Sequence, residues 1–155
     1  MSKLYWLVLP LCLLLCACNE GDNPMLRKHT PIIGAQATAI AEGKFDAAIF
    51  KREMGPIAIK WDGKHYQPFG GIALDEFQAA FDRLVDAAEK SENEEAKRLL
   101  ADVLHNMDTQ YMTEKMVAYR NGFPEPTEEQ KWWVKDKPAG DNSASGNAPA
   151  SNAGG

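Results

Sequence analysis

The chain lacks cysteine beyond its first eighteen residues, since Cys12, Cys16 and Cys18 are all N-terminal. A domain that follows them must hold together through its apolar core, without a disulfide. The chain also has few basic residues for its acidic ones: it contains 17 Lys and Arg and 22 Asp and Glu, which gives a net charge of −5. Phosphate binding depends on clustered Lys and Arg, so we expect no nucleic acid as a partner.

The chain also lacks recognisable catalytic motifs. It contains no Gly-x-Ser-x-Gly sequence and no phosphate-cradling glycine loop. Asp102 and His105 are three residues apart on one predicted helix, but such a pair is too small a ligand set for a metal. We interpret it as part of a solvated helix face. We therefore expect no catalytic residue, no metal site and no enzyme.

The N-terminus carries the strongest pattern in the sequence. Lys3 precedes an apolar run over residues 4–15 that is interrupted only by Pro10. This run is too short to span a bilayer, which takes about 20 residues, but it suits the apolar region of an export signal. Leu15-Cys16-Ala17-Cys18 follows. These four residues resemble the lipobox of bacterial lipoproteins, which has an aliphatic residue three places before the modified cysteine and a small residue directly before it.

The resemblance implies cleavage before Cys18, a diacylglycerol on its thiol and an acyl chain on the new amino group. Apart from these covalent lipids we expect no cofactor. Two alternatives stay open: attachment at Cys16, which would place bulky Leu15 where the family has a small residue, and an ordinary cleaved signal. In this family an aspartate after the cysteine retains the protein in the inner membrane, so Asn19 implies a lipid-anchored outer-membrane location. The resemblance covers residues 1–19 only.

Composition divides the chain into four predicted parts. They are a signal peptide over 1–17, a lipidated tether over 18–31, a small helical domain over 32–137 and a disordered tail over 138–155. The tether contains Gly21, Pro24 and Pro31 and has little apolar periodicity. The tail consists of Ala, Gly, Ser, Asn and Pro with one Asp and no large apolar residue, so it cannot bury enough surface to offset the cost of ordering.

In the first half of the domain, the apolar pattern predicts helices followed by a β-hairpin. Apolar spacing indicates short helices over 34–42 and 45–53, the second ended by Gly55-Pro56. Alternating apolar residues over 57–61 and 64–67 flank Asp62-Gly63, a dipeptide typical of a type I′ turn. We therefore expect one β-hairpin that packs against helices.

In the second half of the domain, the helix-capping residues predict an antiparallel αα-hairpin. A helix capped by Asp75 is followed by a capping box of Ser91 and Glu94, which starts a long helix that continues to Gly122. A short last helix over 128–135 presents two tryptophans. The fold class is therefore mainly α (α+β): an αα-hairpin, short N-terminal helices and one β-hairpin.

Candidate partner contacts come from large side chains of the second half. Adjacent Trp132 and Trp133 point about 100° apart on a helix, so one of them could face a partner. Met112 and Met116 could line an adaptable groove. For all four residues, packing in the domain's own core is the competing interpretation.

We expect a non-catalytic, lipid-anchored envelope lipoprotein that contacts the membrane through its lipid and binds another envelope protein or supports an assembly. The alternatives are an inhibitory, immunity or exclusion-type lipoprotein, and a module that binds an apolar ligand between the long helix and the β-hairpin.

Overall fold

The computed structural model describes residues 23–66 and 71–132. The predicted signal peptide, Cys18 and the predicted tail lie outside these residues. The described elements are α2 (Pro24–Ala41), α3 (Ala47–Ile59), α4 (Ile72–Lys90), α5 (Glu94–Asn106), the 3₁₀-helix η1 (Thr109–Tyr111) and α6 (Glu114–Gly122). The described part of the chain contains no β-strand, so the prediction of a mainly α fold is confirmed.

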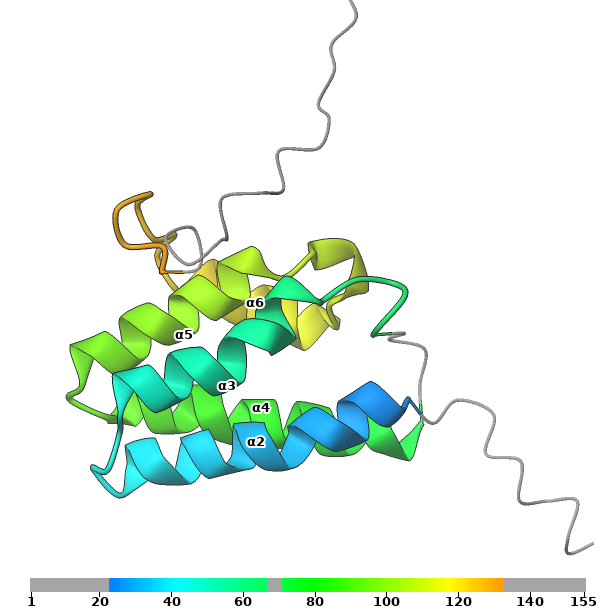
Figure 1. The fold of residues 1–155 in the computed structure, drawn as a ribbon, viewed down its shortest axis with the longest axis horizontal. Helices are drawn as coiled ribbons and strands as arrows, with labels where there is room; N and C mark the ends of the chain where they lie inside the picture. Colours follow the sequence, from blue (N-terminus) through cyan, green and yellow to red (C-terminus); the bar gives the residue numbers. More distant parts are fainter. Residues whose placement is uncertain (1–22, 67–70, 133–155) are drawn as a thin grey trace, which may run out of the picture.

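The helices α2 to α5 form a bundle of two layers (Figure 1). α2 lies beside α4 in one layer and α3 lies beside α5 in the other, and α6 packs on α5. The colours of Figure 1 show that the chain runs in one direction in α2 and α4 and in the opposite direction in α3 and α5. Each layer is therefore a parallel pair, although helices that follow each other in sequence are antiparallel.

The α2–α4 layer is the most closely packed contact between helices. α2 turns Leu26, Ile33, Ala37 and Ile40 into the core, at the spacing of one helical face. On α4 the fully buried residues include Ala73, Ala80 and Ala88 beside larger apolar side chains. Because these alanines are small, the two helix backbones can approach closely.

The start of α2 corrects the predicted tether. Asn23 caps this helix, since its side-chain Oδ1 accepts a hydrogen bond of 2.8 Å from the Met25 backbone N–H. Pro24 occupies the first turn, where its missing N–H costs nothing. Pro31 lies inside the helix and does not end it. Residues 24–31 are therefore part of the folded bundle and do not form a tether.

The predicted β-hairpin is wrong. α3 continues through Gly55 and Pro56 to Ile59, and residues 60–66 form turns. The Asp62 carboxylate accepts hydrogen bonds from the backbone N–H groups of Lys64 and His65, both at 2.8 Å, which builds a side-chain-capped turn instead of a type I′ turn. The buried residues Ile57, Ala58 and Trp61 follow a helical spacing, not an alternating one.

The αα-hairpin is present as α4 and α5, but its second helix is shorter than predicted. α4 starts at Ile72, before Asp75, and Asn93 caps α5 by accepting from the Ala96 backbone N–H at 3.0 Å. α5 ends at Asn106, and the predicted continuation is divided into η1 and α6. Thr113 caps α6 through a 3.1 Å bond from the Met116 N–H. Residues 128–130 form a turn where a last helix was predicted.

Candidate functional site

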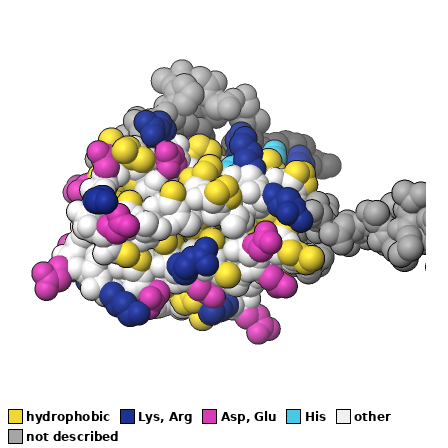
Figure 2. All heavy atoms as spheres, turned by 90° about the horizontal axis from the view of Figure 1, so that it is seen from below, with side chains coloured by type: hydrophobic (Ala, Val, Ile, Leu, Met, Phe, Trp, Pro, Cys, Tyr) yellow, Lys and Arg dark blue, Asp and Glu magenta, His cyan; other side chains and the backbone are white. Residues whose placement is uncertain are grey.

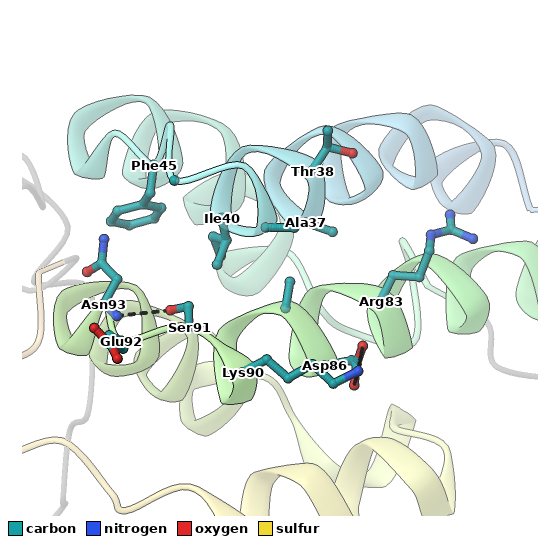
Figure 3. A pocket seen from close by; sticks show the side chains of 13 residues that line it. Ala37, Thr38, Ile40, Phe45, Arg83, Asp86, Lys90, Ser91, Glu92 and Asn93 are labelled. Atoms are coloured by element: carbon teal, nitrogen blue, oxygen red, sulfur yellow. Dashed lines mark hydrogen bonds and ion pairs between the residues drawn. The ribbon is translucent and has the colours of Figure 1, made fainter.

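A cleft of about 700 Å³ opens between the C-terminal ends of α2 and α4 (Figure 3). We call it the distal cleft, because it lies at the end of α2 that is farthest from Pro24. Apolar residues that line it include Ala37, Ile40, Phe45 and Ala87. Phe45 comes from the loop before α3 and lies opposite Asn93, which precedes α5. The cleft is thus bounded by two helices and two loops.

Charges of both signs line the distal cleft. Arg83 and Lys90 stand beside Asp86 and Glu92, so the lining has no net sign. Lys90 Nζ pairs with the Asp86 carboxylate at 2.8 Å along α4. Arg83 and Glu92 lie apart from this pair in the close-up, so the charged groups do not converge on one point. The cleft therefore has apolar walls with charges of both signs around them.

A second cleft of about 640 Å³ lies between α5 and the segment that follows α6. Its lining includes Lys97, Arg98 and Phe123. Arg98 Nη1 donates a 2.8 Å hydrogen bond to the Gln130 carbonyl oxygen. This bond holds the C-terminal segment against α5, so the second cleft is the junction between these two parts of the fold.

A buried polar pair joins the start of α2 to the loop after α3. The Tyr66 hydroxyl and His29 Nδ1 are hydrogen-bonded, and the two rings stack with centroids 5.8 Å apart. Burial lowers the pKa of His29, and the charges of Lys28 and Lys60 lower it further. Burial also raises the pKa of Tyr66. Both groups are therefore neutral near pH 7, and their contact closes the core.

Asp102 is fully buried, which corrects the prediction of a solvated face. Its Oδ2 accepts a 3.1 Å hydrogen bond from the Trp132 backbone N–H, whereas its Oδ1 has no partner. Burial raises the pKa of Asp102 to about 6, against the opposing effects of the Trp132 N–H and of nearby Arg98 and other cations. His105, three residues further along the helix, donates from Nε2 to the Phe123 carbonyl oxygen at 2.9 Å. Asp102 thus fixes the C-terminal segment, a contact that spacing along the helix could not reveal.

The predicted partner-binding residues are placed mostly in the core. Met116 is fully buried and Met112 is only 9% exposed, so neither offers a surface to a partner. Trp132 is partly buried against the core and lies over Gly55 of α3. Trp133 lies outside the described residues, as does the predicted lipidation site Cys18. Within the described residues, neither the long helix nor the β-hairpin that would have bounded the predicted apolar-ligand site is present.

Within residues 23–66 and 71–132, no three His, Cys, Asp or Glu side chains gather as metal ligands. In the same ranges, none of the helices combines the length and the apolar character that crossing a bilayer would take. No protein family matches the chain, and no curated protein or solved structure is similar to it.

Proposed function

We propose that the chain is a lipid-anchored lipoprotein of the bacterial outer membrane whose helical bundle is a non-catalytic module for binding another envelope protein. The observation that carries the proposal is the position of the lipobox-like sequence relative to the bundle. Only residues 19–23 lie between Cys18 and Pro24, the first residue of α2. Five residues reach at most about 18 Å, so a lipid on Cys18 would hold this end of the bundle at the membrane.

The orientation of α2 supports a binding role. The helix has 18 residues, which corresponds to a length of about 27 Å. The distal cleft lies at its far end and would therefore face away from an anchoring membrane, toward other envelope components. Apolar residues surrounded by charges of both signs suit a segment of another protein better than a small charged substrate.

The buried ionisable groups support the non-catalytic part of the proposal. The side chains of His29 and Asp102 both have shifted pKa values, which often marks an active site. Each of them, however, makes a hydrogen bond that joins distant parts of the chain, to Tyr66 and to Trp132 respectively. Neither residue lines the distal cleft.

Replacement of the lipidated cysteine tests the anchor. In a Gram-negative host fed radioactive palmitate, C18A should carry no label and should be released from the outer membrane or remain as uncut precursor. C16A is the matched control and should be labelled and sorted like the parent. Equal labelling of C18A and the parent would refute lipidation at this position.

A photo-crosslinking amino acid tests the binding role. Thr38 is exposed and lines the distal cleft, whereas Glu76 is exposed near the start of α4, at the other end of the bundle. In cells, a crosslinker at position 38 should give one discrete adduct with an envelope protein, and a crosslinker at position 76 should not. Identical adducts from both positions, or none from position 38, would contradict a partner site in this cleft.

A further inference from the structure

One end of the bundle lies close to the proposed lipid attachment. The start of α2, the end of α3, the loop over residues 60–66 and the start of α4 come together here, and we call this the proximal end. If Cys18 is acylated, the five residues before Pro24 are too short to keep this end far from the bilayer. The inference below rests on that proposed anchor.

The loop after α3 is fixed to the start of α2, and this places basic residues together. The Asn23 side-chain Nδ2 donates a 3.0 Å hydrogen bond to the His65 carbonyl oxygen. Lys28 of α2 and Lys60 at the end of α3 are both near enough to His29 to lower its pKa. Lys64 belongs to the same loop and is exposed. Three exposed ammonium groups therefore lie at the proximal end.

Exposed apolar side chains gather at the same end. The exposed large hydrophobic residues of the described chain are Ile59, Ile72 and Ile49, at 62%, 59% and 40% exposure. Ile59 is the last residue of α3 and Ile72 is the first residue of α4. Figure 2 shows basic, acidic, histidine and apolar side chains at the right-hand end of the visible face, which is the proximal end in Figure 1.

We propose that the proximal end rests on the bilayer surface, with Ile59 and Ile72 in the interfacial layer and Lys28, Lys60 and Lys64 among anionic lipid phosphates. Apolar and basic residues side by side are the combination that binds anionic membrane surfaces. Each contact is weak by itself. The short link to the lipid raises the local concentration of bilayer at this end, so weak contacts suffice to orient the bundle.

The acidic residues nearby are compatible with this contact. The Asp62 carboxylate accepts hydrogen bonds from the backbone N–H groups of Lys64 and His65 and from the His65 ring, so it is turned toward its own loop. Asp75 and Glu76 follow Ile72 by about one helical turn on α4. Their repulsion of an anionic surface would limit the contact to the first residues of α4 and keep the helix axis off the membrane plane.

Single cysteines can test this contact in the lipidated protein. After processing, the only native cysteine left is the acylated one, so I59C, I72C and I49C each introduce one free thiol. The third variant is the matched control, because Ile49 precedes Ile59 by ten residues, about 15 Å along α3. Each purified, lipidated variant is labelled with an environment-sensitive fluorophore and reconstituted into phosphatidylethanolamine–phosphatidylglycerol vesicles that carry nitroxide-labelled lipid.

Labels at positions 59 and 72 should shift to shorter wavelength and be quenched by the nitroxide, and the label at 49 should do neither. Replacing the three lysines by glutamine, or phosphatidylglycerol by phosphatidylcholine, should reduce the quenching. A lipidated protein that floats with vesicles while all three labels stay equally hydrated would overturn the membrane contact alone. A protein that carries no acyl chain and does not float would overturn the proposed anchor together with this inference.

Discussion

The buried carboxyl group of Asp102 makes stability depend on pH in a way that one substitution can isolate. Burial raises its pKa from 3.8 to about 6 in the folded protein. Between these pH values the folded state binds more protons than the unfolded state. The contribution of Asp102 to the free energy of unfolding is therefore fully present below about pH 3.8 and is lost as the pH rises through about 6. A shift of about two pKa units corresponds to about 3 kcal/mol.

Asp102→Asn keeps the size of the side chain and an oxygen for the Trp132 N–H, but it removes the titration. Urea unfolding, followed by helical circular dichroism, gives the free energy of unfolding at about pH 4 and about pH 7.5. The stability of the variant relative to the parent should rise by up to about 3 kcal/mol between these pH values. Other titrating groups, including His29, are present in both proteins and cancel in the difference.

The control is Asp86→Asn, which removes the carboxylate of an exposed ion pair with Lys90. It should change stability by less than about 1 kcal/mol at both pH values. If the difference between Asp102→Asn and the parent stays constant with pH, the carboxyl group is not desolvated, and the role assigned to it is wrong.

Two further substitutions test the packing that the structure describes. Gly55→Ala places a Cβ 2.6 Å from Cη2 of Trp132 and should lower the free energy of unfolding by about 1–3 kcal/mol, whereas Gly122→Ala, with nothing within 4 Å, should not lower it. Thermal melts would compare the two, and equal midpoints would contradict the Trp132 contact. Tyr66→Phe leaves His29 Nδ1 buried without its hydrogen bond, which should cost about 1–3 kcal/mol in a urea titration at neutral pH. A loss below about 0.3 kcal/mol would mean that solvent replaces the hydroxyl.

Apolar periodicity predicted the α4–α5 hairpin because that information is local. The apolar residues Phe77, Phe81, Leu84, Val85 and Ala88 recur at helical spacing and are buried on one face of α4. Each of these side chains is buried in the core, as its spacing along the helix indicates. The length of the second helix was not predictable in this way, since the break after Asn106 depends on caps that compete with continued helix.

The predictions at two glycines were wrong because each glycine makes room for a side chain that is distant in the sequence. Gly55, read as a helix terminator, provides space for the Trp132 ring inside a helix that continues. Gly63, read as half of a type I′ turn, does not have the positive φ which that turn requires. A Cβ there would lie 2.6 Å from the Tyr111 ring, so close approach of a distant residue explains the glycine. Neither partner can be inferred from neighbours in sequence.

The candidate sites were predictable to different degrees. The pattern at Cys18 is contiguous, so it is readable directly, and its lipidation stays a prediction. The start of α2 was missed, although Asn23 followed by Pro24 is a typical cap and first turn. The distal cleft was not predictable, because it joins α2 and α4, which are remote in sequence and meet only in the folded bundle.

The pairing of α2 with α4 determines when a growing chain can fold. A polypeptide that emerges from a ribosome or a translocation channel exposes α2 first, yet the main partner of α2 ends only at Lys90. Until then the apolar face of α2, with Leu26, Ile33 and Ile40, has no adequate cover. Nascent chains stalled before α4 should therefore be degraded by proteases or held by chaperones, and resistance to digestion should appear abruptly once the α4–α5 hairpin is complete.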